Sequence, residues 1–155
     1  MKLDVGSGDT PEPGFTTFDQ FAPADVSGDM RDLPFPPGSV DAINCSHALE
    51  HLERKDVVTA LEQFRRVLRR RGTLRVVVPD FDYACRQWLD GVGEDRDIAY
   101  RSIYGGQTRQ GQYHLSGWDR WTLADAVEEA GFEVVKVSME PSHGTVCVVV
   151  EAFVP

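Results

Sequence analysis

The sequence predicts an α/β fold, with a mainly parallel sheet, helices on its faces and an antiparallel hairpin at the C-terminal end. The first observation is a short strand pattern at residues 3–5 that runs directly into two glycines. The second is an alternation of buried-strand and helical patterns in the middle of the chain, which is typical of parallel sheets joined by helices. The third is a pair of β-branched runs, 132–137 and 145–153, whose close spacing favours a hairpin.

Length and charge narrow the function classes. The chain has 155 residues, with 25 acidic and 16 basic side chains and a net charge of −9. This length suits one domain with one core, so we expect residues 1–155 to form a single domain. The acidic excess argues against a nucleic-acid partner, because phosphate binding needs clustered Lys and Arg. No apolar run is long enough for a membrane span, and the N-terminus shows no signal-peptide pattern.

The cysteines bear on the cellular compartment. Cys45, Cys85 and Cys147 are odd in number, widely spaced and without a CxxC pair. This pattern favours reduced thiols, and we therefore expect a cytoplasmic protein.

The start of the chain predicts a ligand pocket. The strand at 3–5 leads into Gly6 and Gly8, and an extended piece, 15–18, then delivers Asp19. In an open α/β sheet, ligands bind at the carboxyl ends of the strands. Glycines there let the backbone approach a ligand closely, and a carboxylate at the tip of the next strand can bind both hydroxyls of a ribose. The sequence therefore predicts a nucleoside pocket.

The residues after the glycine pair distinguish between kinds of nucleoside. A dinucleotide site needs a third glycine and a helix whose N-terminus holds the pyrophosphate. Here Pro11 stands in the third position, and Pro13 and Gly14 favour a turn or loop where that helix would begin. A ligand with a ribose and an adenine but no phosphate fits better than NAD or FAD. The sequence thus indicates S-adenosylmethionine.

Four segments complete the first part of the chain. Residues 24–30 predict a short strand and its exit, and the proline-rich segment 33–39 predicts a turn. Residues 40–45 have the pattern of a buried strand, and a helical turn is expected within 47–52.

A helix is predicted over residues 56–70, with Gly72 as its stop. Its apolar residues recur at spacings of four and three, as in Val57, Leu61, Phe64 and Leu68. Near its end stand five arginines: Arg65, Arg66, Arg69, Arg70 and Arg71. We interpret them as cations that complement the helix dipole, rather than as a nucleic-acid site, because the chain as a whole is acidic.

The second half begins with a β-branched run at 74–78, which is typical of a central parallel strand. It places Asp80 at the carboxyl edge of the sheet, before a helix expected at 83–89. Residues 90–117 form the least regular part, with glycines interleaved among aromatic residues. We expect residues 83–120 to supply a lid and a substrate surface.

The closing unit has a predicted helix and two strands. Thr122 with Asp125 three residues later resembles a capping box at the start of the helix, and Gly131 marks its stop. The two final strands are joined by a loop around Pro141 and Gly144.

Taken together, these residues resemble the class I S-adenosylmethionine-dependent methyltransferases, and among them the type-11 methyltransferase domain. The matching pieces follow the family's order over most of the chain: Leu3 to Gly8, Asp19, Gly28-Asp29, Leu33-Pro34-Phe35, Ser39-Val40-Asp41, His47 to Leu52, and Gly131-Phe132. The resemblance implies a Rossmann-like fold, S-adenosylmethionine as cofactor and methyl transfer as the reaction. The chain departs from the family at its short N-terminus and in the loss of the helix between the first two strands. We therefore expect a homodimer partner, another chain or residues 90–118 to cover an exposed sheet face.

The resemblance also implies roles for individual residues. Gly6 and Gly8 would pass the methionine part of the cofactor, and Asp19 would hold the ribose hydroxyls. The adenine would meet Asp29 and the backbone of Met30. Ser46 and His47 would lie near the methyl-bearing sulfur. The complete set implied for cofactor binding is Asp4, Val5, Gly6, Ser7, Gly8, Asp19, Gln20, Asp29, Met30, Ser46 and His47.

We expect methyl transfer to a small-molecule or saccharide-like acceptor. Such an in-line displacement at carbon mainly requires alignment of nucleophile, methyl group and sulfur. An oxygen nucleophile also needs a base with a pKa near neutrality. The candidates for this base are His47 and His114, with Asp80 third, and no metal site is expected.

Two other functions stay open. The chain could bind the cofactor without catalysis, as a subunit or sensor, because fold and pocket do not establish activity. In addition, His47, Glu50 and His51 match the H-x-x-E-H pattern of one class of zinc protease. This pattern follows a predicted strand, however, which is the context of the methyltransferase motif and not of a metalloprotease helix.

Overall fold

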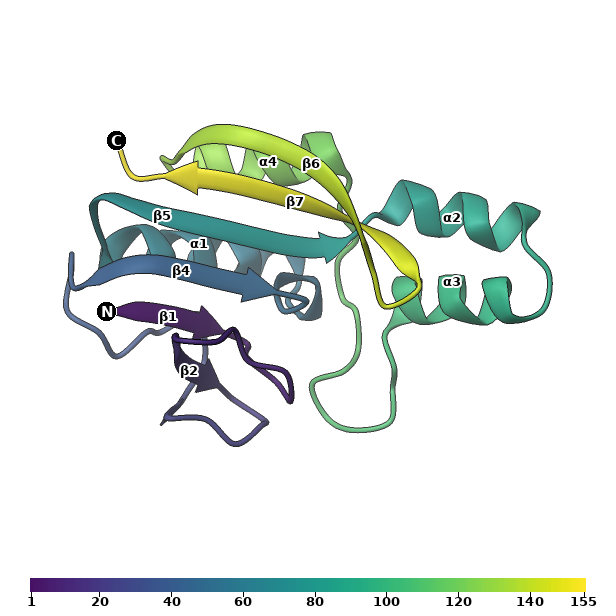
Figure 1. Ribbon diagram of the computed structural model, residues 1–155, viewed down its shortest axis with the longest axis horizontal. Helices are drawn as coiled ribbons and strands as arrows, with labels where there is room; N and C mark the ends of the chain where they lie inside the picture. The colour runs from purple at the N-terminus through teal and green to yellow at the C-terminus, as the bar shows by residue number, and fades with distance from the viewer.

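A seven-stranded sheet organises the computed structural model, which describes residues 1–155 (Figure 1). The strand order is β3-β2-β1-β4-β5-β7-β6. All neighbours from β3 to β5 pair in parallel, whereas β7 is antiparallel to both β5 and β6. The strands are β1 (Lys2–Val5), β2 (Thr16–Asp19), β3 (Val26–Ser27), β4 (Val40–Ser46), β5 (Leu68–Pro79), β6 (Glu133–Ser142) and β7 (Thr145–Phe153). The predicted mainly parallel sheet with a C-terminal antiparallel hairpin is confirmed.

The helices lie behind one face of the sheet and beyond one of its ends. In Figure 1, α1 (Arg54–Val67) and α4 (Arg120–Glu129) both lie behind the sheet. The pair α2 (Phe81–Asp90) and α3 (Glu94–Tyr104) extends past the end of β5. A single 3-10 turn, η1 (Leu49–His51), follows β4. No helix lies over the face turned to the viewer, which we call the open face.

Strand alternation explains the difference between the two faces. Leu3, Ile43 and Leu74 stand side by side on β1, β4 and β5, and all belong to the core that α1 fills with Leu61 and Phe64. The residues that follow them on these strands, Asp4, Asn44 and Arg75, point to the open face and are polar.

This polar row crosses five strands on the open face. It consists of Asp4, Asn44, Arg75, Glu151 and Lys136. The side-chain amide of Asn44 donates to the Asp4 carboxylate over 2.7 Å. The Lys136 ammonium nitrogen lies 3.7 Å from a carboxylate oxygen of Glu151. In a parallel sheet with helices on both faces, the strands carry apolar residues on both faces. The polar residues of this row therefore explain why no helix covers the open face.

The predicted helix at 56–70 is wrong at its C-terminal end. α1 ends at Val67, and Gly72 lies inside β5 instead of capping the helix. The pairing between β4 and β5 shifts its register here, and the Arg71 amide donates to the carbonyl of Val154. A Cβ on Gly72 would lie 2.8 Å from the Arg69 carbonyl oxygen, so crowding in this irregular strand, not a helix stop, explains the glycine.

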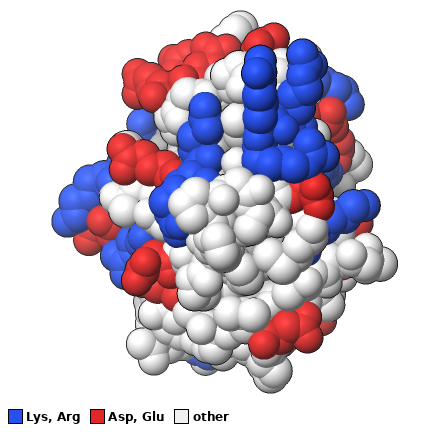
Figure 2. All heavy atoms as spheres, turned by 90° about the vertical axis from the view of Figure 1, so that its left-hand side faces the viewer, with Lys and Arg blue, Asp and Glu red and all other residues white.

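The arginines therefore divide into two groups. Only Arg65 and Arg66 lie in the last turn of α1, where the dipole argument applies. The other three, Arg69 to Arg71, are exposed at the end of the sheet opposite the carboxyl edge of the parallel strands. Figure 2 looks onto this end and shows basic side chains interspersed with acidic ones.

Two further expectations need correction. Residues 90–117 contain a complete helix, α3, which the sequence did not predict. The helix α4 begins after Asp119, whose side chain accepts from the amides of Trp121 and Thr122, so Thr122 is the third helical residue and not the cap. Gly131 follows α4 with a φ of 87°, as predicted for a helix stop.

The C-terminal hairpin is tighter than predicted. Pro141 lies within β6, which is an edge strand and tolerates the missing donor, and only residues 143 and 144 form the turn. None of the helices is both long and apolar enough to cross a membrane.

Candidate functional site

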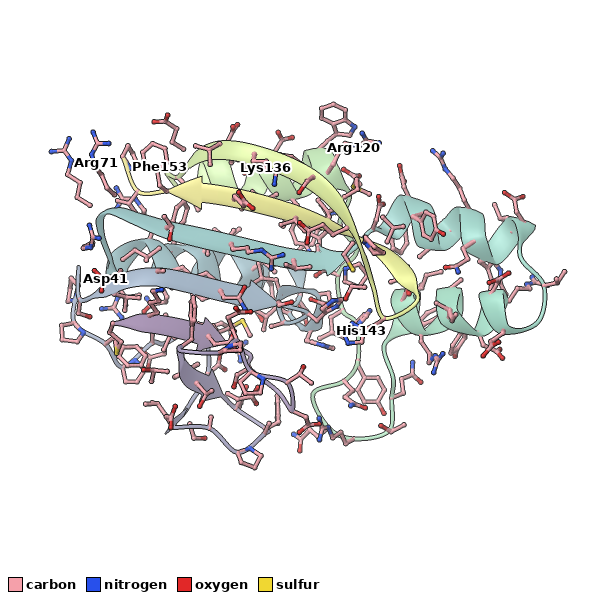
Figure 3. All side chains as sticks on the ribbon, in the orientation of Figure 1. Asp41, Arg71, Arg120, Lys136, His143 and Phe153 are labelled. Carbon is pink, nitrogen blue, oxygen red and sulfur yellow. The ribbon has the colours of Figure 1, made fainter.

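An open cleft of about 910 Å³ lies at the carboxyl ends of the parallel strands. Its walls come from the loop after β1, the tips of β2 and β4, and the segment 109–115. The turn of the β6–β7 hairpin, with His143 labelled in Figure 3, also lines the cleft, as do residues 28–31, 51–53 and 56. This is the position in which open α/β sheets bind ligands, and the volume suits a ligand of nucleoside size.

Only glycine fits at position 6, because of its backbone conformation and its close neighbours. Its φ is 70°, and a Cβ built on it would lie only 2.3 Å from the Cβ of Ala48. The Gly6 amide donates to the carbonyl of Phe18 over 2.8 Å. The backbone after β1 is therefore pressed against the turn after β4, and any side chain at position 6 would disturb this floor of the cleft.

Asp19 ends β2 as a buried carboxylate that lines the cleft. One oxygen accepts from the amides of Phe21 and Ala22, both over 2.7 Å, and the other accepts from Gly8 over 2.9 Å. A carboxylate has about four acceptor positions, so only about one stays free. To hold both ribose hydroxyls, Asp19 would have to exchange the bond from Gly8 for one from the ligand.

Asp4 also lines the cleft, but both of its oxygens are engaged. One accepts from Asn44, and the other accepts from the Glu12 amide over 2.8 Å. These bonds fix the helix-free loop between β1 and β2. Asp4 therefore shapes the cleft by holding this loop in place, and not by binding a ligand directly.

The predicted adenine residues, Asp29 and Met30, both line the cleft. The Arg31 guanidinium, which bonds directly to the Asp29 carboxylate, outweighs burial and holds the pKa of this group below its usual value. Arg31 also reaches Asp56 over 2.8 Å. The Asp29 carboxylate is thus charged and held in place beside the cleft.

His47 is the one predicted base that lines the cleft. It has a φ of 53°, and its Nε2 lies 3.1 Å from the hydroxyl of Ser142 and 3.8 Å from the sulfur of Cys147. Burial lowers the pKa of His47, but the hydrogen bond to Cys147 and the charge of Glu50 outweigh burial and raise it to about 10. Its Nδ1 faces the Glu50 carboxylate at 3.5 Å and its Nε2 faces the Ser142 hydroxyl, so neither ring nitrogen is open to a substrate as a base requires.

The other two predicted bases lie outside the cleft. Asp80 is buried at the start of α2, where its carboxylate accepts from the Tyr83 amide as a helix cap. His114 is 11% exposed, and its Nδ1 donates to the carbonyl of Ser102 over 2.9 Å. Burial, partly offset by the charge of Glu50, lowers the pKa of His114.

Most of the predicted cofactor set comes together. The cleft is lined by Asp4, Gly6, Ser7, Gly8, Asp19, Gln20, Asp29, Met30, Ser46 and His47. Val5 is the exception, because its side chain is fully buried in the core. The Ser7 hydroxyl is buried without a hydrogen-bond partner, which leaves a polar atom free for a ligand.

Sequence reasoning missed the specific contacts that join the segment 109–115 to the opposite side of the cleft. Arg109 forms an ion pair with Asp9 over 2.7 Å, which joins the segment 109–115 to the loop after β1. Gly111 packs its backbone so closely on Phe21 that a Cβ would lie 2.4 Å from the ring. The only sequence signal for these contacts was the density of glycines and aromatic residues in 90–117.

The H-x-x-E-H motif does not have protease geometry. His51 belongs to a 3-10 turn of three residues, and His47 precedes that turn with a left-handed backbone. The two histidines therefore do not project from one face of an α-helix, as the zinc protease pattern requires.

The lining of the cleft is strongly acidic. Only three cationic side chains, Arg31, Arg75 and Arg109, accompany seven carboxylates: Asp4, Asp9, Glu12, Asp19, Asp29, Glu53 and Asp56. This charge favours a ligand with cationic groups over a phosphate ester.

Similar solved structures show the fold. A SAM-dependent methyltransferase from Methanosarcina mazei is 15% identical with a TM-score of 0.70, and the match covers 99% of this chain and 91% of that one. A 1,6-didemethyltoxoflavin-N1-methyltransferase from Burkholderia thailandensis, solved with S-adenosylhomocysteine, is 17% identical with a TM-score of 0.69, over 98% and 69% of the two chains. These TM-scores and coverages show that the chain has the fold of the class I methyltransferases.

A sequence-family comparison goes further than the fold. Residues 3–76, just under half of the chain, match the model of the methyltransferase domain family of type 11. The cofactor of the family is S-adenosylmethionine. No curated protein matches the sequence.

A third similar structure contains a second protein chain. It is a putative methyltransferase from Haloferax volcanii in complex with the Trm112 methyltransferase activator, 17% identical with a TM-score of 0.65, over 99% and 81% of the two chains.

Proposed function

We propose that this chain transfers the methyl group of S-adenosylmethionine to a small-molecule or saccharide-like acceptor. The observation that carries the proposal is the floor of the cleft, where Gly6 contacts Ala48 and Asp19 ends β2 beside it. A glycine such as Gly6 leaves room for a ligand beside the backbone, and the buried carboxylate of Asp19 can bind hydroxyl groups. Both features suit a nucleoside that lies across the carboxyl edge of the sheet.

Three features of the cleft fit this cofactor. The unpartnered hydroxyl of Ser7 can bond to its polar methionine part. The acidic lining suits the positive charges of a sulfonium and an amino group. The loop between β1 and β2 contains no helix whose N-terminus could hold a phosphate, so the cleft disfavours dinucleotides.

The cofactor supplies an electrophilic methyl group, and the residues of this chain align and shield it. We assign the ribose to Asp19 and the adenine side to Asp29 and Met30. Ser142 holds Nε2 of His47, so that the imidazole ring is fixed at the wall of the cleft. Alignment of this kind is the main requirement of an in-line displacement.

We further propose that residues 83–120 act as the lid. The ion pair between Arg109 and Asp9 and the contact between Gly111 and Phe21 both join this segment to the cofactor side of the cleft. Exclusion of water by such a segment would protect the reacting groups during transfer.

One observation favours a second candidate, a cofactor-binding module without catalysis. His114 and Asp80 lie outside the cleft, and both ring nitrogens of His47 face protein groups, so none of the three predicted bases is free to accept a proton from an acceptor hydroxyl. This module would bind S-adenosylhomocysteine but release no product with any acceptor.

We also propose that a second copy of this chain covers the open face. A shallow hollow of about 560 Å³ on this face is lined by Phe15, Val135 and Phe153 beside the charged side chains of Arg75 and Glu151. The Haloferax complex shows that a domain of this fold can work with a second chain. A monomeric mass in light scattering at micromolar concentration would refute the dimer.

Calorimetric titration with S-adenosylhomocysteine tests the cofactor site. We expect Asp19→Ala to weaken binding by about 1–3 kcal/mol, the usual loss for hydrogen bonds to a charged group. Asp125→Ala removes an exposed carboxylate from α4 and serves as the matched control. Equal affinity of both variants and wild type would refute the assignment of Asp19, and absence of binding to wild type would refute the function.

The reaction is then tested with a panel of hydroxyl, amine and sugar acceptors, by following release of S-adenosylhomocysteine. Release with at least one acceptor supports the transferase. Binding without release across the panel supports the module.

A further inference from the structure

We propose that Glu50, His51 and His114 form a binding site for a divalent transition-metal ion of the zinc class. One ligand atom from each of these residues lies within 4.8 Å of the other two. The site adjoins the cleft, because His51 lines the cleft whereas Glu50 and His114 lie behind it. The proposal is independent of cofactor binding and methyl transfer.

Glu50 is the observation that calls for a cation. Its side chain is 2% exposed, and neither carboxylate oxygen has a hydrogen-bond partner. A buried carboxylate without partners is costly, and proteins compensate such a charge with a cation or a hydrogen bond. Its nearest nitrogen is Nδ1 of His47 at 3.5 Å, and Nε2 of His114 follows at 4.0 Å.

Both histidines of the site are held in the tautomer that binds a metal. Nδ1 of His51 lies 3.0 Å from the carbonyl of Tyr113, and Nδ1 of His114 lies 2.9 Å from the carbonyl of Ser102. A carbonyl oxygen can only accept, so each neutral ring carries its proton on Nδ1 and its lone pair on Nε2. Metal-binding histidines typically donate their other ring nitrogen to a carbonyl in this way.

The residue types identify the class of metal. Two imidazoles and one carboxylate suit zinc and related transition metals better than Mg²⁺ or Ca²⁺, which prefer oxygen ligands. Tetrahedral bonds of about 2.1 Å would bring the ligand atoms to roughly 3.3 Å from one another. The three side chains would therefore draw together by about an ångström, and water or a cleft ligand would complete the coordination.

A metal at this site would link the lid to the sheet. Glu50 and His51 belong to η1 directly after β4, whereas His114 comes from the segment proposed as the lid. The backbone already joins the two parts, because the amides of Leu115 and Ser116 both donate to the Glu50 carbonyl. A bound ion would add three side-chain bonds to this junction, so metal binding should order the segment 105–118.

The test uses the full chain without an affinity tag, stripped of metal and titrated with zinc. We expect one zinc ion per chain, a rise in the thermal midpoint and slower hydrogen exchange over 105–118, since an ion that binds only the native state stabilises it. Glu50→Gln and His114→Ala should each weaken zinc binding at least tenfold. His143→Ala removes a histidine that also lines the cleft but lies outside the site, and should leave zinc affinity unchanged.

Two results would overturn the proposal. The first is wild-type protein that binds less than a tenth of an equivalent of zinc and shows no change in thermal midpoint. The second is stoichiometric binding that survives both Glu50→Gln and His114→Ala, because the zinc would then be bound elsewhere.

Discussion

Replacement of Gly6 by alanine tests the floor of the cleft most directly. Gly6 has a φ of 70°, and the added Cβ would lie 2.3 Å from the Cβ of Ala48. Two non-bonded carbons normally stay about 3.5–4.0 Å apart, so the loop after β1 or the turn after β4 has to move by more than about 1 Å. Because both segments line the cleft, the movement should affect ligand binding together with stability.

The magnitude follows from two separate costs. A left-handed backbone costs a residue with a Cβ about 1–2 kcal/mol, and overpacking of a tight contact costs about 1–3 kcal/mol. Gly6→Ala should therefore destabilise the protein by about 2–5 kcal/mol. Gly14→Ala is the matched control, since Gly14 has a φ of 81° but nothing within 4 Å of its built Cβ. This control should show the backbone cost alone.

A second substitution separates the clash from the backbone cost. Ala48→Gly removes the methyl group that the new Cβ would meet, at a cost of about 1–2 kcal/mol for lost burial and added chain entropy. In Gly6→Ala/Ala48→Gly the overpacking should disappear, so the double variant should be more stable than the sum of the single effects by about 1–3 kcal/mol. Urea unfolding, followed by the fluorescence of the buried Trp118, measures all four free energies. Additivity within about 0.5 kcal/mol would refute the contact.

Three further predictions follow from single side chains. Phe64→Ala empties a fully buried position in α1 and should cost about 3–5 kcal/mol in urea unfolding, whereas a loss below about 1 kcal/mol would contradict the packing of α1 on the sheet. Asp119→Ala removes the cap of α4 and should cost about 1 kcal/mol at neutral pH. Because a hydrogen bond from the Thr122 amide lowers the pKa of Asp119, this stabilisation is present above the unfolded value of 3.8 and is lost as the pH falls through the lower folded value. Equal loss at pH 7 and pH 2 would contradict it. Arg109→Ala breaks an exposed ion pair and should change stability by less than about 1 kcal/mol, but it should speed the dissociation of S-adenosylhomocysteine in stopped-flow measurements. An unchanged rate would exclude the ion pair from lid closure.

The meeting of the residues after β1 and β2 in one cleft could be predicted because their signals are local. Gly6, Gly8 and Asp19 lie within 17 residues of the first strand, and strand, turn and acid follow one another without interruption. Pro11 and Pro13 likewise predicted correctly that no helix joins β1 and β2. Each of these inferences depends on the backbone preference of a single residue type.

Helix boundaries failed where packing overrides local preference. The apolar period of α1 continues through Leu68, but this leucine pairs with Val40 as the first residue of β5. Thr122 resembled a cap because Asp125 follows it at the right spacing, whereas Asp119 is the residue whose side chain bonds to the free amides. The end of α1 is thus set by the pairing of Leu68 with a distant strand. The start of α4 is set by the Asp119 carboxylate, which is a better acceptor for the free amides than the Thr122 hydroxyl.

The helix α3 was missed because its apolar pattern is weak, although its first turn is acidic and Gly105 follows its last residue. It begins after Gly93, which provides no side-chain cap, and only Ala99 within it is buried. Packing of Tyr100 near Trp88 of α2, with ring centroids 6.3 Å apart, supports it instead. A helix supported by one neighbouring helix shows little amphipathic pattern.

The meeting of Glu50, His51 and His114 had no signal in the sequence, since His114 is 64 residues from Glu50 and stood in a segment without predicted structure. Two backbone features bring the three residues together. The turn η1 after β4 carries Glu50 and His51. The chain then returns from α3 along this turn, where the amides of Leu115 and Ser116 donate to the Glu50 carbonyl. The return ends where Trp118 bridges to Asp80 at the end of β5. The segment is thus fixed at its C-terminal end, whereas Arg109 contacts the loop after β1 and Gly111 packs on Phe21 after β2. Opening should therefore begin at residues 105–111, which gives a ligand access to the cleft without disturbing Glu50 and His114 behind it.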